Sequence, residues 1–353
     1  MEISNVIQLL SNAAIYASSL FIPILAQEMG ASSFEIGIMV SVFYLTYFIA
    51  SYFLGILSDR YGLNKFLRIG LLGSSIFFAL QVLAKDLPSL FWFRALAGLA
   101  AGIFPAALEV YASEERAGRV GKFTAYGSLG WALGAILAGF LGQYHLIFMV
   151  SAGLFFLSFL VSWKLKELKH HAEAPFFPWE LVRRNALVYL PYFLRAIGAQ
   201  SVWAVFPLYL LSLGANKFWI GIIYFVNAGS QFLMMQHIER FRNLYLFNLG
   251  LLCSVMTFTA YTFMPNFWWI FPVQLLLAFS FSSLQVGAHQ ELLRRNREKA
   301  TVVGILNSTV NFTAVIGPFL AGILLQSFGF RGVMWFAAMI SFAGLISFTK
   351  VLK

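Results

Sequence analysis

Long apolar runs decide what this chain can fold into. The sequence holds twelve of them, each about 17–25 residues long, with short polar stretches between most of them. They are too long for strands and lack the alternation of polar and apolar residues seen in a membrane barrel. Hydrophobic residues make up 60% of the chain and charged residues 11%, against about 45–50% and about 25% in an ordinary soluble domain. The sequence therefore predicts an all-α polytopic membrane protein with twelve transmembrane helices.

Two bundles of six spans are expected, because the longest polar stretch follows the sixth apolar run. We place an N-terminal bundle over 1–165, a cytoplasmic interdomain loop over 166–185 and a C-terminal bundle over 186–353. Within the loop, Pro178–Arg184 favours a short helix on the membrane surface with Trp179 as its anchor. The expected spans are Val6–Ala26, Ile36–Leu57, Leu67–Leu87, Leu90–Tyr111, Phe123–Leu141, Ile147–Trp163, Leu187–Leu213, Phe218–His237, Leu244–Phe263, Phe267–Gly287, Val302–Leu325 and Gly332–Phe348.

The positions of Lys and Arg predict the orientation in the membrane. Nineteen of the 24 lie on the side that also holds both termini, and three lie on the other side. The remaining two, Arg94 and Arg195, lie within expected spans. Because cytoplasmic loops are enriched in Lys and Arg, we expect a multi-pass protein of the cell (plasma) membrane with both termini in the cytoplasm. This arrangement accounts for the net charge of +10 without a nucleic-acid partner.

The two halves resemble each other in sequence. The stretch Gly30–Ile38 recurs 184 residues later as Gly214–Ile222, with the glycine, alanine, phenylalanine, isoleucine and second glycine preserved. The stretch Gly134–Gly139 recurs 183 residues later as Gly317–Gly322. Asp59 and Arg60 have a weaker echo in Glu239 and Arg240, without the glycine that follows. Three collinear matches at nearly one offset indicate two six-span repeats in the same orientation.

The octet from Gly55 to Gly62 separates the second and third apolar runs. Asp59 and Arg60 are too polar for hydrocarbon, so we expect a loop here that emerges into water, with Gly62 supplying a tight turn. The pattern G-x-L-x-D-R-x-G, with Leu57, resembles the signature loop of the major facilitator superfamily of secondary transporters. After Gly62 the sequence departs from the consecutive basic residues usual in that family.

The resemblance implies a gating role for this loop. It implies that Asp59 meets the N-terminal end of the eleventh span, near 301–303, where the helix dipole is positive. That contact would form when the cytoplasmic side closes and break when it opens. Arg60 could in turn pair with Glu114 or Glu115 in the next inner loop.

Two glycine-rich motifs extend the resemblance. Arg94, Gly98 and Gly102 form R-x-x-x-G-x-x-x-G in the fourth span, similar to a motif of proton-coupled exporters. That similarity implies a role for Arg94 in substrate or proton coupling; the alternative is an arginine that extends to the outer interface. In the fifth span a glycine stripe resembles the drug–proton antiporter motif, although Trp131 stands in place of its proline. Close helix packing is the stronger interpretation of this stripe, which consists of Gly127, Gly130 and Gly134.

Glu109 is our candidate proton site, because it is one of few carboxylates near a span interior. A proton-coupled carrier needs a group that binds and releases a proton as access alternates. A carboxylate in a poorly solvated place has its pKa raised toward the working range. The alternative, which the position near the end of the span favours, is a solvated glutamate.

Other polar and aromatic residues within the spans could line a substrate cavity. Arg195 lies deep in the seventh span and could attract an anionic substrate or pair with a structural acid. Several polar residues lie one helical turn apart on a single face, where hydrogen bonding to another helix is the common alternative. The cavity candidates are Asn12, Tyr16, Arg195, Gln200, Trp203, Tyr224, Asn227, Gln231, Gln285, Asn307 and Asn311.

These features predict secondary active transport of a small molecule by alternating access. No G-x-x-x-x-G-K-[ST] loop occurs, so ATP is not expected to drive transport. Cys253 is the single cysteine, and we expect no metal, no cofactor and a monomer in the lipid bilayer. We hypothesise a proton-coupled exporter, an antiporter, of amphipathic drug-like compounds or sugars. The alternative transporter is an importer or facilitator of a sugar or carboxylate without proton coupling.

A membrane-embedded enzyme or a sensor is the alternative from another class. Such an enzyme would need a polar catalytic set at membrane depth, for example paired aspartates or H-E-x-x-H. Neither pattern is present, and Asp59 and Asp86 are the only aspartates. A sensor would lack a signalling domain in this chain. We therefore expect a transporter and no enzymatic activity.

Overall fold

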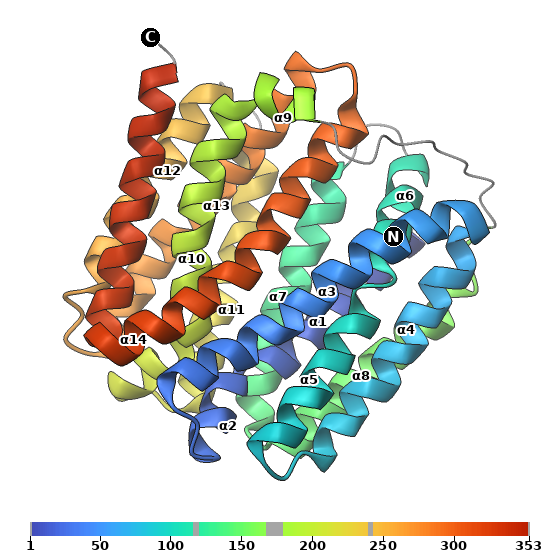
Figure 1. The fold of residues 1–353 in the computed structure, drawn as a ribbon, viewed down its shortest axis with the longest axis horizontal. Helices are drawn as coiled ribbons and strands as arrows, with labels where there is room; N and C mark the ends of the chain where they lie inside the picture. The colour runs from blue at the N-terminus through green and yellow to red at the C-terminus, as the bar shows by residue number, and fades with distance from the viewer. Residues whose placement is uncertain (1, 116–119, 167–178, 239–242, 352–353) are drawn as a thin grey trace. The chain divides into compact units, whose positions relative to one another are not determined.

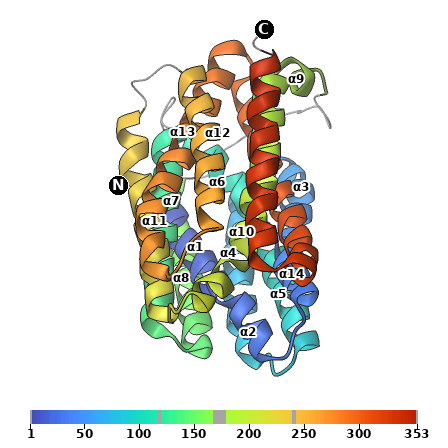
Figure 2. The same cartoon turned by 90° about the vertical axis from the view of Figure 1, so that its left-hand side faces the viewer.

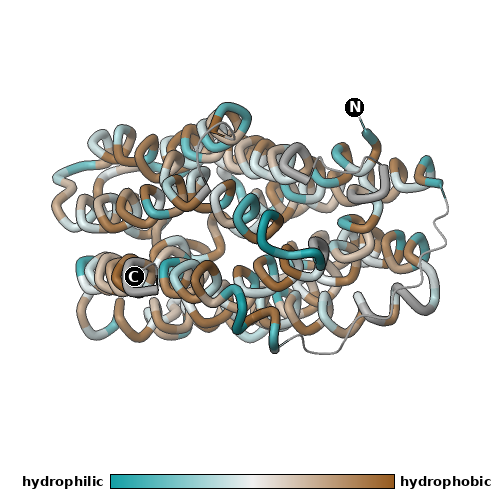
Figure 3. Tube along the Cα trace, turned by 90° about the horizontal axis from the view of Figure 1, so that it is seen from above, coloured by the Kyte–Doolittle hydropathy of each residue, from teal (hydrophilic) through white to brown (hydrophobic). Residues whose placement is uncertain are grey.

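The computed structural model describes residues 2–115, 120–166, 179–238 and 243–351, and these are helical with short connections (Figure 1). Hydrophobic residues run along most of the trace (Figure 3). The elements are α1 (Ile3–Leu20), α2 (Ile22–Glu28), α3 (Ser33–Tyr61), α4 (Leu63–Leu80), η1 (Gln81–Leu83), α5 (Leu87–Ala101), α6 (Pro105–Glu115), α7 (Val120–Leu141), α8 (Tyr144–Ser162), α9 (Trp179–Arg184), α10 (Ala186–Ser212), α11 (Lys217–Ile238), α12 (Asn243–Tyr261), η2 (Phe267–Trp269), α13 (Ile270–Arg295) and α14 (Lys299–Val351).

Eleven stretches of the described chain are long and apolar enough to cross a membrane. The longest of them, Thr301–Phe348, is two helices that α14 joins at Gly329, where φ is 65° and ψ is −170°. The orange and red parts of α14 accordingly run in different directions (Figure 1). Counting these two parts separately agrees with the twelve helices expected from the sequence.

Two expected spans are each built from two helices. The first breaks at Phe21 between α1 and α2, because Pro23 lacks the N–H that a continuous helix would need. The fourth breaks between α5 and α6, and Pro105 opens α6 at a position where its missing N–H costs nothing. The sequence had predicted one uninterrupted span in each place.

The expected loop from Gly55 to Gly62 is wrong, because α3 continues through Asp59 and Arg60 to Tyr61. Only Gly62 leaves the helix, with φ of 105°, and α4 begins at the next residue. The N–H of Gly62 donates to the carbonyl oxygen of Ser58 at 3.0 Å. A helix satisfies its own backbone groups, so it can extend into the polar region without needing a loop.

The structure divides into two compact units. Unit 1 comprises Met1–Ser32, Val42–Glu173 and Ala215–Phe232, and unit 2 comprises Ser33–Ser41, Ala174–Gly214 and Leu233–Lys353. In unit 1, α1 packs on α7 and α8, and α4 packs on α5 and α8. In unit 2, α10 packs along α14, and α12 packs on α13 and α14 (Figure 2). The units do not follow the halves of the chain, and the division into 1–165 and 186–353 stays a prediction.

Two places where helices cross at glycines explain why each unit includes a short segment from the other half of the chain. In unit 2, a Cβ at Gly37 would lie 2.9 Å from the Cα of Gly322, and Ser41 Oγ donates to the carbonyl oxygen of Val315 at 2.9 Å. In unit 1, a Cβ at Gly139 would lie 2.9 Å from the Cα of Gly221. All four glycines belong to the sequence repeats. The repeats are therefore places where two helix backbones approach closely.

Candidate functional site

Three rings and an amide from unit 1 form a cluster that we call the Tyr16 cluster: Asn12, Tyr16, Trp131 and Tyr224. Trp131 Nε1 donates to Asn12 Oδ1 at 2.9 Å. The Tyr16 ring stacks on Trp131 with centroids 6.1 Å apart and meets the Tyr224 ring edge-on at 5.9 Å. Three of the cavity candidates are thus brought together, and Trp131 joins them.

The glycine stripe of α7 produces this meeting. A Cβ at Gly130 would lie 2.9 Å from Asn12 Cβ, and one at Gly134 would overlap with the carbonyl oxygen of Ala13. At Gly127 the nearest atom is Gln8 Nε2, 3.2 Å away. Without side chains on this stripe α7 approaches the backbone of α1, and Trp131 comes within reach of Asn12.

Asn227 and Gln231 lie one turn apart on α11, as their spacing predicts. Gln231 Nε2 donates to Asn227 Oδ1 at 2.7 Å, and both side chains are buried. A hydrogen bond within one helix face lowers the cost of placing two amides among apolar residues.

Arg94 is buried inside unit 1 and does not extend to the outer interface. Its side chain is 1% exposed. Nη1 donates to Gln81 Oε1 at 3.4 Å and Nη2 to Ser19 Oγ at 3.3 Å. The guanidinium carbon lies 4.2 Å from the centre of the Phe43 ring. Gly98 and Gly102 let α5 approach α3 closely, because an added Cβ at either position would overlap with a carbonyl oxygen of α3. This close approach holds Arg94 in its buried place.

A cavity of about 470 Å³ lies beside this arginine network in unit 1. Gln81 lines it, together with Tyr144 and Lys217. The Lys217 ammonium lies 3.8 Å from the centre of the Tyr144 ring and 3.5 Å from Glu28 Oε1. One side chain, Gln81, therefore connects the buried Arg94 to a cavity within the size range of small-molecule sites.

Glu109 lies on α6 with an exposed side chain. Protein atoms therefore do not enclose its carboxylate, in contrast to the poorly solvated setting considered above. Tyr47 of α3 is near enough to interact with it electrostatically. Its part in proton coupling stays a prediction.

In unit 2, Arg195 is the centre of a group that we call the Arg195 site: Arg195, Ser254, Phe258, Ser280 and Phe281. Arg195 Nε donates to Ser254 Oγ at 2.8 Å. The guanidinium carbon lies 5.8 Å from the centre of the Phe258 ring and 5.9 Å from that of Phe281. The hydroxyls of Ser254 and Ser280 are hydrogen-bonded at 2.6 Å.

The other candidates in unit 2 have separate surroundings. Tyr192, one turn before Arg195 on α10, donates its hydroxyl to Gln285 Oε1. Gln200 packs on α14, where a Cβ at Gly317 would lie 2.5 Å from that of Gln200. The Trp203 ring meets Phe206 edge-on at 5.4 Å. The half-buried pair on α14 consists of Asn307 and Asn311.

The expected gating contacts lie outside the described residues. Asp59 and Arg60 are placed in α3, but their side chains are not described, and neither are those of Glu114 and Glu115. The backbone of this region is close-packed at Gly55, where a Cβ would lie 3.2 Å from Ala106 Cβ. The gating role of these residues stays a prediction.

Sequence reasoning missed a buried acid, Glu291 on α13, which is 1% exposed. Arg294 Nη2 lies 2.8 Å from its Oε1, and Arg295 also pairs with it. The spacing E-x-x-R-R, three and four residues apart, was the available signal. Over the part of the chain that the structure describes, no group of three His, Cys, Asp or Glu side chains could hold a metal ion.

Comparisons with known proteins agree with this architecture. The tetracycline resistance protein, class C, of Escherichia coli is 23% identical over 311 residues, covering 80% of this chain and 78% of that protein. The multidrug resistance protein MdtG of Yersinia enterocolitica is 28% identical over 166 residues, 44% of this chain and 40% of that protein. The crystal structure of the nucleoside transporter NupG matches with a TM-score of 0.79 at 13% identity and covers 100% of both chains. The family model of the Major Facilitator Superfamily matches residues 5–290, and the chain therefore belongs to this superfamily of membrane transporters.

Proposed function

We propose that this chain exports small amphipathic molecules by proton-coupled alternating access. The names of two relatives, a tetracycline resistance protein and a multidrug resistance protein, support drug-like substrates. The Tyr16 cluster carries the proposal, because it presents ring faces and an amide side by side within the first unit. Such a surface suits a substrate with a flat apolar body and a few polar groups. Sugars are the second substrate class, favoured by the buried amides Asn227 and Gln231.

In alternating access, the substrate site is open to one side of the membrane in one state and to the other side in the second state. A substrate binds in the state open to one side and leaves in the state open to the other. Glu109 would take a proton on one side of the membrane and release it on the other, so that the gradient drives net export. The exposed carboxylate of Glu109 is compatible with proton exchange with water.

Vesicles that contain the purified protein and an internal pH dye test the proposal. A panel of sugars, carboxylates and amphipathic drugs is added, and proton movement is recorded with the passage of labelled compound. One compound class is expected to drive proton movement in the wild type, and Glu109→Gln is expected to abolish it. The matched control is Glu180→Gln on α9, which removes an exposed carboxylate elsewhere. Passage of compound with no proton signal would disprove proton coupling and leave transport standing.

The hydrogen bond between Trp131 and Asn12 gives a second prediction. Trp131→Phe keeps a ring beside Tyr16 but removes the N–H that Asn12 accepts. A net hydrogen bond is worth about 0.5–1.5 kcal/mol, so the KM for an amphipathic substrate is expected to rise about 2- to 13-fold. Transport rates at varied substrate concentration measure this. Trp179→Phe on α9, whose ring is exposed, should leave KM unchanged; an equal KM in both variants would remove the Tyr16 cluster from the substrate site.

A further inference from the structure

The positive charge of Arg195 is surrounded by neutral groups. The side chain is 4% exposed, and among the residues that the structure describes no carboxylate forms an ion pair with it. Its contacts are one serine hydroxyl and the faces of two phenylalanine rings. The titratable groups that interact with it electrostatically, Tyr192 and Tyr261, are phenols that are neutral at physiological pH. The site therefore holds an uncompensated cation.

The terminal nitrogens of Arg195 are available for a ligand. Nε is occupied by Ser254, whereas neither Nη1 nor Nη2 donates a hydrogen bond to any residue of the described ranges. Arg94 differs in this respect, because both of its terminal nitrogens are bonded within unit 1. An arginine with a free pair of parallel N–H groups is arranged to receive two oxygen atoms of one planar anion.

This chain neutralises a buried charge elsewhere in the same unit. Glu291 on α13 is more deeply buried than Arg195 itself, and it pairs with both Arg294 and Arg295. A buried charge without a partner is costly, and a buried ionisable residue within a membrane span is a functional site by default. The missing partner of Arg195 is therefore expected to arrive from outside the protein.

We propose that Arg195 binds the carboxylate of an amphipathic organic anion, which narrows the substrate class and rests on the proposed transport function. The two terminal nitrogens would hold the carboxylate oxygens, and the partly exposed ring of Phe281 would contact the apolar body beside it. One guanidinium balances one negative charge. A doubly charged phosphate would leave a net negative charge in a poorly solvated place, so a carboxylate is the better match.

Two fluorescent probes that differ only in charge test this assignment. Dansylglycine carries a carboxylate, and dansylglycinamide carries a neutral amide on the same body. Their dissociation constants are measured by dansyl fluorescence with the full chain in lipid nanodiscs, with the signal of empty nanodiscs subtracted. The wild type is expected to bind dansylglycine about tenfold or more tightly than the amide, as a charge-assisted pair of hydrogen bonds should.

Substitutions separate the charge from the fold. Arg195→Gln is expected to reduce the preference to within about twofold by weakening carboxylate binding alone. Arg195→Lys keeps the charge but loses the paired geometry, so it should retain part of the preference. Arg183→Gln removes an exposed cation of α9 and should keep the full preference. Melting curves show whether each variant is folded. If Arg195→Gln does not fold, the partial loss of preference in Arg195→Lys still tests the site.

The outcomes distinguish this inference from the proposed function. Equal dissociation constants for both probes in the wild type, binding of neither probe, or an unchanged preference in Arg195→Gln would each overturn the anion site. None of these results would affect export of a neutral compound in the vesicle assay. Conversely, a tenfold preference that Arg195→Gln removes would support the site even if no compound were exported.

Discussion

Gly98→Val is expected to lower the melting temperature of the purified protein by on the order of 10 °C. A Cβ at Gly98 would overlap with the carbonyl oxygen of Phe43 and with Thr46 Oγ1. The carbonyl belongs to the backbone of α3 and cannot turn away, so α5 and α3 must separate. Overpacking of this kind costs about 3 kcal/mol or more when backbone has to move. Gly98→Ala should also destabilise, because the clash begins at Cβ.

The same substitution should disturb Arg94, which lies one turn before Gly98 on α5. The guanidinium of Arg94 reaches the Phe43 ring only because the two helices touch at this crossing. Gly153→Val on α8 is the matched control, since nothing lies within 4 Å of a Cβ at Gly153. The control should melt within a few degrees of wild type. A Gly98→Val protein that melts together with the control would show that the α3–α5 crossing is not tight.

The apolar runs predicted the helices well because length and composition are local properties. The breaks inside the first and fourth spans had a local signal in Pro23 and Pro105, but that signal is ambiguous, since membrane helices often tolerate proline. The helical continuation of α3 through Asp59 and Arg60 was missed for another reason. Polarity shows where a chain leaves hydrocarbon, but it does not show that the helix ends there.

The candidate site was only partly predictable, because its contacts join residues far apart in the chain. The bond between Asn12 and Trp131 spans 119 residues, and neither residue's neighbours indicate the other. The burial of Arg94 depends on a glycine crossing whose two helices are adjacent only in the folded protein. The sequence repeats contained the glycines at which the helices cross, Gly37 and Gly322 among them. Which glycine meets which is decided by tertiary packing, and the sequence alone did not show it.

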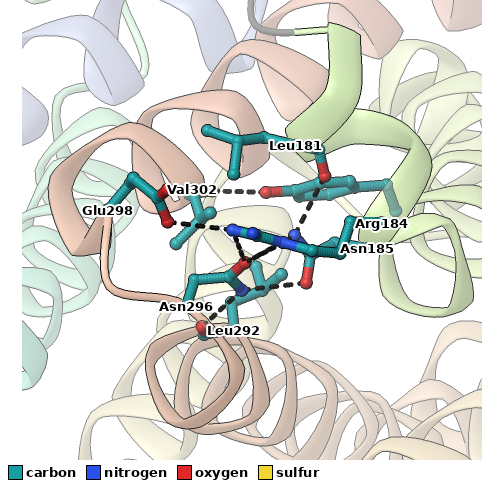
Figure 4. A network of polar contacts seen from close by, with 8 residues as sticks. Leu181, Arg184, Asn185, Leu292, Asn296, Glu298 and Val302 are labelled. Carbon is teal, nitrogen blue, oxygen red and sulfur yellow. Dashed lines mark hydrogen bonds and ion pairs between the residues drawn. The ribbon is translucent and has the colours of Figure 1, made fainter.

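Asn296→Leu is expected to destabilise unit 2 by about 3 kcal/mol, because it removes one acceptor from three donors. Asn296 Oδ1 accepts from Arg184 Nε at 3.0 Å, from Arg184 Nη2 at 2.6 Å and from Asn185 Nδ2 at 3.0 Å. Asn296 Nδ2 donates back to Asn185 Oδ1 at 2.9 Å. Figure 4 shows this pair of amides between the α9–α10 junction and the turn before α14. Asn185 is buried, so water cannot replace the partner that its side chain loses, whereas the half-exposed Arg184 can turn to water.

Cys253 provides the readout, since it is the single cysteine of the chain and is buried in unit 2. A thiol-reactive dye that fluoresces on labelling reports its exposure as the protein is heated. Asn185→Leu together with Asn296→Leu should cost less than the sum of the two single changes, because removing both amides leaves fewer groups unpaired. Strict additivity would mean that the two amides do not act as a pair.

The ion pair at the edge of this network should matter far less. Arg184 Nη2 lies 2.8 Å from Glu298 Oε2, but both side chains are about half exposed. Hydrogen bonds from its own backbone and from Arg184 lower the pKa of Glu298. Its contribution is therefore present above the ordinary carboxylate pKa and is lost as the pH falls through the lowered value. Glu298→Gln should therefore lower the stability far less than Asn296→Leu at neutral pH. An equal loss in the two variants would show that the ion pair, and not the buried amides, stabilises this junction.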